Sequence, residues 1–349
     1  MKHSPDCDAS LSGDSGPDAR GLALRNWVEQ RLGTVLETLE PITPDASRRR
    51  YYRLQYTDRS LIAMDAPPEH EPLAPFLRVQ ALMHDAGLHV PEVLAVDESA
   101  GFALLSDLGR HTLLDVLSPG NANALFGLCF ETLIRWQSAS RPGCLPAYSA
   151  ELLRAELQLF VDHYLGWHLG LPAAICDDDR LADLRDRLVA RALAQQQVFV
   201  HRDFMPRNLM LSKPAPGVLD FQDAVLGPIS YDPVCLLLDA FISWPAARVE
   251  SWLLDYHQQG LQVGLPLPDD SARFLSDCRW MAVQRHLKVL GVFARIRRRG
   301  GPSRYLDDAP RFFAYLDWAI GAEPDLQLLT TLRAEWEAER VHRLPSAGR

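Results

Sequence analysis

Two short apolar runs, each followed directly by polar side chains, constrain the fold of this chain more than any other feature. Val198–Val200 leads into His201-Arg202-Asp203, and Asn208 follows five residues after the aspartate. Val218–Leu219 leads into Asp220-Phe221. Short apolar runs bounded by polar residues are typical of strands. The pattern therefore predicts two strands whose ends bring two aspartates and an amide together.

This set of side chains suits phosphoryl transfer, which needs a base near the nucleophile and oxygen ligands for Mg²⁺. Asp203 is predicted to be the catalytic base, which orients a substrate hydroxyl and accepts its proton. Asn208 and Asp220 carry the hard oxygen atoms that Mg²⁺ prefers and are predicted to be its ligands. His201 is expected to pack within the loop and organise it. The competing interpretation is a chance coincidence of common residues.

The rest of the chain changes its periodicity near residue 109. Before that point, a helical pattern over 22–39 is followed by a hairpin at 51–56 and 61–64, a helix over 75–86, and strands at 93–96 and 102–105. After it, helical spacing dominates. We expect an α+β chain with a disordered segment over residues 1–21, a small sheet-containing lobe over 22–107 and a larger, mainly helical lobe over 108–349.

The segment Val198–Asp223 resembles the catalytic and Mg²⁺ loops of the aminoglycoside phosphotransferase and choline kinase superfamily, which has the bilobal protein-kinase-like fold. Further strings resemble, more narrowly, the kinases of bacterial cell-wall recycling that phosphorylate the anomeric hydroxyl of N-acetylmuramate or N-acetylglucosamine. This narrower resemblance covers roughly residues 22–340. It is carried by Asp45–Tyr52, Met64–Pro68, Leu104–Gly109, Gly217–Asp223 and Tyr231-Asp232.

The resemblance implies ATP and Mg²⁺ as cofactors and an amino sugar as the acceptor. Asp232 is expected to brace the catalytic loop, and Asp223 either to support it or to contact the substrate. The other residues that the resemblance implies are Ser47, Arg48 and Arg49 for the phosphates, Ser106, Asp107 and Leu108 for adenine, and His201 and Arg207 in support of the loop.

Two lysines of kinase-like sites are missing from this chain. Met64 stands where the strand lysine that pairs the phosphates is expected, and Met205 stands two residues after Asp203, where protein kinases carry another lysine. Some cation must still neutralise the triphosphate. The guanidinium fork suits phosphate oxygens, so the candidates are Arg48, Arg49, Arg50 and Arg207. A solvated hairpin edge or a structural salt bridge is the alternative interpretation of these arginines.

The charge and cysteine content exclude several other classes of protein. Acidic residues outnumber basic ones by 45 to 36, which gives a net charge of −9 and argues against a nucleic-acid or membrane partner. The six cysteines form no Cys-x-x-Cys pair, so reduced thiols and a cytoplasmic location are expected. No apolar run is long enough to span a bilayer.

Two other functions remain open at this point. An aminoglycoside or aminoalcohol kinase is one, because an acidic chain suits a cationic acceptor. A nucleotide-binding pseudokinase or regulatory module is the other, because the two lysines are missing. Two further clusters have two interpretations each. One cluster either forms a solvated helix end or contacts the acceptor: Arg295, Arg297, Arg298 and Arg299. The other either belongs to the core or contacts the acceptor: Trp244, Trp252, Trp280 and Tyr305.

Overall fold

The chain divides into two compact units. The structure, a computed structural model, describes residues 18–42, 48–301 and 304–343. The first unit comprises Met1–Ala74 and Pro91–Asp107, and the second comprises Pro75–Val90 and Leu108–Arg349. Residues Pro75–Val90, which the sequence places in the first lobe, pack instead with the second unit, where Phe76 stacks on Phe221 at 5.0 Å.

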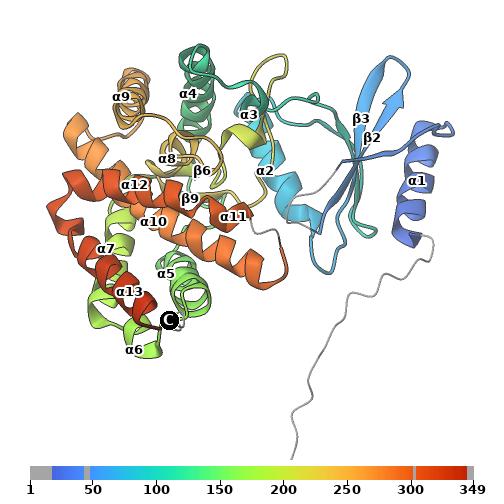
Figure 1. Cartoon of the computed structure of the whole chain (residues 1–349). Coiled ribbons are helices and arrows are strands. Elements are labelled where there is room, and N and C mark those ends of the chain that lie inside the picture. The colour runs from blue at the N-terminus through green and yellow to red at the C-terminus, as the bar shows by residue number, and fades with distance from the viewer. Residues whose placement is uncertain (1–17, 43–47, 302–303, 344–349) are drawn as a thin grey trace, which may run out of the picture. The chain divides into compact units, whose positions relative to one another are not determined.

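The first unit is a five-stranded antiparallel sheet with one helix packed on it (Figure 1). Leu24, Trp27 and Val28 of the helix form a core with Leu61 and Phe102 of the sheet. The sheet order is β1-β2-β3-β5-β4. The elements are α1 (Ala19–Leu32), β1 (Glu40–Ile42), β2 (Arg50–Tyr56), β3 (Arg59–Asp65), β4 (Val93–Asp97) and β5 (Phe102–Ser106).

The hairpin and the two later strands agree with the sequence prediction, but the first helix does not keep its predicted bounds. Asp18 caps α1 by accepting a hydrogen bond from the Gly21 N–H at 3.1 Å. Residues 18–21 are therefore ordered, which corrects the expected disordered segment for those positions; residues 1–17 lie outside the described chain. Gly33 ends the helix at residue 32 because it adopts a left-handed conformation with φ 67°.

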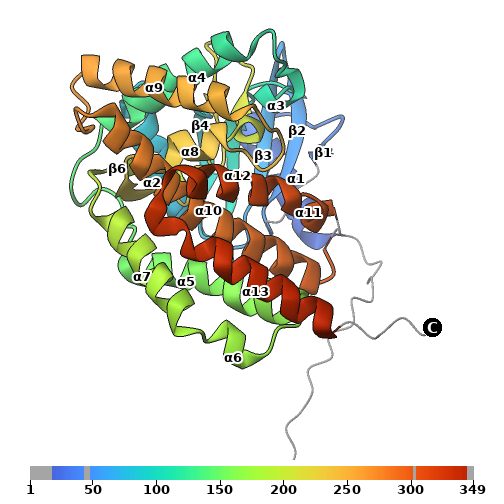
Figure 2. The same ribbon diagram turned by 60° about the vertical axis from the view of Figure 1, so that its left-hand side comes forward.

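The second unit consists of helices around two small antiparallel sheets, β6-β9 and β7-β8. Its longest helix, α10, packs against α5, α7, α8, α9 and α12 (Figure 2). The helices are α2 (Leu73–Asp85), α3 (Leu113–Val116), α4 (Ala122–Ser138), α5 (Ala150–Leu159), α6 (Ala173–Cys176), α7 (Asp179–Leu193), α8 (Tyr231–Leu237), α9 (Ala246–Gln262), α10 (Ser271–Arg298), α11 (Arg304–Asp307), α12 (Ala309–Ala322) and α13 (Leu328–Arg343). The strands are β6 (Gln197–Val200), β7 (Leu209–Met210), β8 (Gly217–Val218) and β9 (Val225–Pro228).

Two features of this unit differ from a simple helical pattern. The apolar stripe that begins in α5 continues beyond it as a π-helical segment, Phe160–His168. Strand β9, which the sequence does not predict, pairs with β6 over the register Gln197↔Pro228 to Val200↔Val225. This pairing fixes the end of β6, from which the loop that carries Asp203 begins. In the described part of the chain, no helix is long and apolar enough to cross a membrane.

Candidate active site

The loop after β6 is held by the ring of His201. The Nδ1 atom accepts a hydrogen bond from the Asp203 N–H at 3.2 Å, and Nε2 lies 3.0 Å from the Leu219 carbonyl oxygen. A carbonyl only accepts, so Nε2 carries the proton and donates it. Complete burial lowers the pKa of His201 and keeps the ring neutral. The ring thus connects the loop that carries Asp203 to the segment that carries Asp220.

Asn208 makes a second connection between the same segments. It ends a 3₁₀ turn, Pro206–Asn208, and its Nδ2 donates to the Asp203 carbonyl at 2.9 Å. Its own carbonyl accepts from the Leu219 N–H at 2.9 Å. The structure therefore brings together the loop positions of Asp203, Asn208 and Asp220. Among the described residues, neither Asn208 Oδ1 nor the Asp203 carboxylate accepts a hydrogen bond, so both can face a ligand.

Two residues next to this site adopt a backbone conformation that L-residues rarely take. Arg202 has φ 76° and Asp220 has φ 61°. Such a conformation costs about 1–3 kcal/mol and persists only where the surrounding structure imposes it, as it commonly does at functional sites. It occurs immediately before Asp203 and at Asp220, which makes this loop pair a candidate functional site.

The electrostatics around Asp220 favour a cation. The surrounding protein and the negative charge of Asp203 raise the pKa of the Asp220 carboxyl, although its side chain reaches the surface. Its Oδ1 accepts a hydrogen bond from Gln222 Nε2 at 2.8 Å. In the described ranges no group of three or more His, Cys, Asp or Glu side chains is arranged to hold a metal. Mg²⁺ needs fewer, because one or two carboxylates and the substrate phosphates usually suffice.

Asp232 at the start of α8 contacts the main chain of the loop that carries Asp203. Its carboxylate accepts hydrogen bonds from the N–H groups of His201 at 2.7 Å and Arg202 at 3.1 Å. The side chain is fully buried, and burial raises the pKa of Asp232 to about 7 even though both N–H groups act in the opposite direction. This geometry suits a residue that braces the loop, which is the role the resemblance implies.

The two other supporting residues lie nearby on the same unit. Arg207 places its guanidinium over the ring of Phe241 at 4.7 Å. Asp223 has an exposed side chain, and its carbonyl oxygen accepts a hydrogen bond from Arg202 Nη1 at 3.4 Å. The contact of Asp223 with the loop is thus through its main chain.

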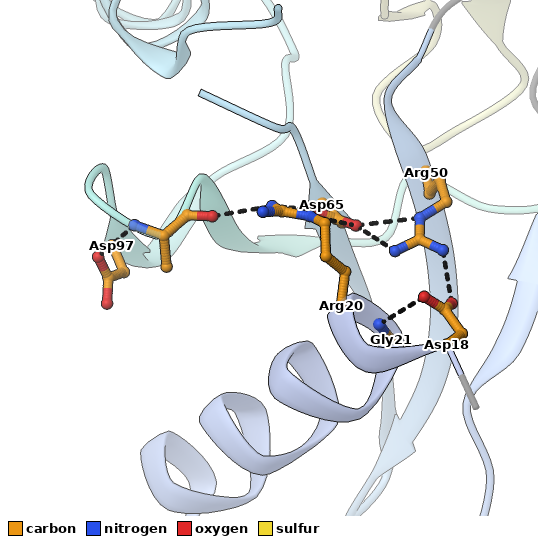
Figure 3. Close-up of polar contacts among 7 residues, drawn as sticks. Asp18, Arg20, Gly21, Arg50, Asp65 and Asp97 are labelled. Carbon is orange, nitrogen blue, oxygen red and sulfur yellow. Dashed lines mark hydrogen bonds and ion pairs between the residues drawn. The ribbon is translucent and has the colours of Figure 1, made fainter. Parts of the chain in front are cut away.

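The candidate nucleotide residues of the first unit are largely engaged by their neighbours. Arg49 is buried and pairs with Glu71 at 3.0 Å. Arg50 pairs with Asp65 at 2.6 Å and with Asp18 at 2.5 Å (Figure 3). Arg48 is exposed, and Ser47 lies outside the described residues. Met64 is fully buried in β3 beside Asp65, so its side chain is core.

The candidate adenine residues lie at the end of β5. The Ser106 N–H donates to the Glu92 carbonyl at 2.9 Å. The Asp107 carboxylate accepts hydrogen bonds from Arg53 Nε and from the Ser60 hydroxyl, both at 2.6 Å. Leu108, the third residue, is the first of the second unit's main segment and is buried. Nucleotide contacts of these three residues remain a prediction.

The two clusters with open interpretations have clear surroundings in the second unit. The four aromatic residues are buried, with exposed fractions of 9% or less, as core residues are: Trp244, Trp252, Trp280 and Tyr305. The arginines at the C-terminal end of α10 are half-buried at Arg295 and exposed from Arg297 to Arg299, as at a solvated helix end.

Sequence reasoning missed the side chains that contact Arg202. Its guanidinium donates to Glu156 Oε1 at 2.5 Å, and the same oxygen lies 3.1 Å from Lys288 Nζ. The available signal was a charged residue within an apolar helical stripe. Glu156 stands between Leu153 and Leu157, and Lys288 between Leu287 and Leu290.

The chain belongs to the phosphotransferase enzyme family, which it matches over residues 38–272. It is similar to the N-acetylmuramate/N-acetylglucosamine kinase of Pseudomonas aeruginosa, with 53% identity over 91% of this chain and 97% of the relative. It is also similar to the kinase of that name from Neisseria meningitidis, with 41% identity over 85% and 90% of the two chains. The family resemblance drawn from the sequence is confirmed.

Solved structures confirm the kinase-like fold class. A choline kinase from Streptococcus pneumoniae superimposes with a TM-score of 0.61 at 12% identity, over 84% of this chain and 99% of the other. An ADP-bound aminoglycoside phosphotransferase superimposes with a TM-score of 0.58 at 13% identity, over 87% and 99%.

Proposed function

We propose that this protein is an ATP-dependent kinase that phosphorylates the anomeric hydroxyl of N-acetylmuramate or N-acetylglucosamine, giving the 1-phosphate used in cell-wall recycling. The observation that carries this proposal is the identity of 53% over nearly the whole length of a relative that bears this name. The five free cysteines of the described chain suit the cytoplasmic location that we propose with it.

In this proposal Asp203 accepts the proton of the sugar hydroxyl, because its carboxylate is exposed to a ligand at a rigidly held loop. Asn208 Oδ1 and the Asp220 carboxylate would hold Mg²⁺, which supplies positive charge against the phosphates. The protein contributes mainly position and charge, as is usual for phosphoryl transfer. Among Arg48, Arg49, Arg50 and Arg207, we propose that at least one contacts the phosphates in place of the missing lysine.

An acceptor panel tests the function. ATP and Mg²⁺ are supplied with N-acetylmuramate, N-acetylglucosamine, an aminoglycoside, choline or no acceptor, and ADP release is measured. We expect turnover with the two amino sugars. Turnover with the antibiotic or choline alone would favour the corresponding kinase, and none with any acceptor would favour a pseudokinase. Phosphorus NMR of the sugar product should show coupling to the anomeric proton; a 6-phosphate would refute the anomeric assignment.

The metal assignment is tested separately. Asp220→Ala should weaken Mg²⁺-dependent binding of ATP, measured by calorimetry, while ATP binding without Mg²⁺ changes little. Asp223→Ala, which alters a neighbouring exposed carboxylate, is the matched comparison. Unchanged Mg²⁺-dependent affinity in Asp220→Ala would remove Asp220 from the proposed ligand set.

A further inference from the structure

A closed ring of buried polar contacts surrounds Arg202, the residue before the proposed base. The Arg202 guanidinium donates to Glu156, and Glu156 lies 3.1 Å from the ammonium group of Lys288. Lys288 also donates to the Tyr231 hydroxyl at 3.2 Å. The next residue, Asp232, accepts the Arg202 N–H at 3.1 Å. The ring therefore joins the side chain of Arg202 to its own main chain. Tyr148 packs beside it, because its hydroxyl donates to Glu156 and its ring lies 5.5 Å from that of Tyr231. Lys288 is the polar link that contacts both Glu156 and the Tyr231 hydroxyl.

The members of this ring are shielded from water. Residual exposure is 5% for Glu156, and 14% for the side chain of Lys288. Burial alone would raise the pKa of Glu156, but Lys288 and Arg202 lower it below its ordinary value, so the carboxylate is charged. Charged hydrogen bonds are stronger in such surroundings than in water, and removal of one partner affects the others.

The two helices that carry Glu156 and Lys288 are held in one register. Gln284 donates to the Leu153 carbonyl at 3.2 Å, one turn before the ion pair. One turn beyond it, Gly291 packs directly on the backbone of Leu159 and Phe160, where a side chain would not fit. The spacing of 284, 288 and 291 along α10 places all three contacts on one helix face. Lys288 therefore has little freedom to move away from Glu156.

We propose that Lys288 is a positioning residue for phosphoryl transfer: through Glu156 and Tyr231 it holds Arg202 in its left-handed conformation and thereby fixes the position of the Asp203 carboxylate. This inference rests on the proposed function. The left-handed φ of 76° at Arg202 is disfavoured for an arginine, so neighbouring contacts must impose it. Lys288 lies outside the catalytic sequence motif, and it acts through other residues.

The test is a comparison of two variants on the same helix, assayed with ATP and N-acetylglucosamine. Lys288→Met should lower kcat by about 10- to 100-fold, because small displacements of a reacting group have effects of that size. KM for ATP and for the sugar should change less than about 2-fold, because ground-state binding is untouched. Arg279→Met is the matched control. The Arg279 side chain is 14% exposed, as is that of Lys288. It pairs with Glu250 at 3.0 Å and with Glu323 at 3.6 Å, nearer the N-terminal end of α10.

A purely structural role predicts that both variants lose thermal stability and that neither changes kcat. That result, with an active wild type, would overturn the positioning role alone. A wild type that releases no ADP with sugar would refute the proposed function, and the positioning role with it. Lys288→Arg should recover part of the lost kcat. If Lys288→Met does not fold, Tyr231→Phe removes only the hydroxyl link and decides the question: it should lower kcat at constant KM, and an unchanged kcat would contradict the proposal.

Discussion

Among the described glycines of the second unit, Gly291 lies closest to a neighbouring backbone, and its replacement by alanine gives a quantitative prediction. A Cβ at this position would lie 2.6 Å from the Leu159 carbonyl oxygen and closer still to Leu159 C and Phe160 N. Carbon atoms in good contact lie about 3.5–4.0 Å apart, so α5 and α10 would have to separate by roughly 1 Å. Overpacking of this kind costs about 1–3 kcal/mol, and the upper end applies here because the opposing atoms are backbone.

Alanine also favours the helix by about 1 kcal/mol over glycine, so the net expected loss is about 2 kcal/mol. For a unit of this size that corresponds to a fall of about 4–8 °C in Tm, which thermal unfolding followed by circular dichroism measures. Gly127→Ala is the control, because Gly127 lies within α4 and a Cβ there meets nothing within 4 Å. It should raise Tm slightly. Equal Tm values for the two variants would refute the close-contact argument.

Two further predictions concern charge and pH. Burial lowers the pKa of His286 to about 3, whereas the unfolded chain takes up this proton near its ordinary pKa of about 6.5. Below that pH the unfolded state binds more protons than the folded state. The protonation of this group therefore lowers the free energy of unfolding by about 2 kcal/mol as the pH falls from about 7 to about 5. Urea unfolding at both pH values should show that the free energy of unfolding depends less on pH in His286→Gln than in the wild type, by the same amount of about 2 kcal/mol. An unchanged pH dependence would contradict the assignment. Asp65 is fully buried and accepts hydrogen bonds from Arg20 and Arg50 (Figure 3). Asp65→Asn should therefore lower the free energy of unfolding by about 2 kcal/mol. Asp58→Asn, at an exposed position, is the control, and an equal loss in both variants would count against this prediction.

Much of the fold could be predicted because its local patterns agree with its tertiary contacts. This holds for the hairpin of β2 and β3 and for the runs before His201 and Asp220, because each is a short apolar segment bounded by polar residues. The first helix was predicted too long because its apolar spacing continues past Gly33, and only the left-handed cap shows where the chain leaves the helix. Strand β9 was missed because Val225–Pro228 contains a glycine and a proline, and its pairing with β6 is a long-range contact.

The residues of the candidate site likewise include some that the sequence predicts and others that it does not. Asp203, Asn208 and Asp220 follow from spacing, because they lie within one short segment. The contacts of Glu156 and Lys288 with Arg202 do not, since these residues are far apart in the sequence and each is hidden in an apolar helix face. The pairing of Arg49 and Arg50 with Glu71 and Asp65 likewise depends on how the sheet folds.

The proposed role of Asp203 as the base of a sugar kinase is tested by comparing the wild type with Asp203→Asn. ADP release is followed with ATP, Mg²⁺ and N-acetylglucosamine, and ATP binding is measured on the same samples. We expect turnover by the wild type, a loss of about 10²–10⁴-fold in kcat for Asp203→Asn, and unchanged ATP affinity. An Asp203→Asn variant that turns over at the wild-type rate would contradict it.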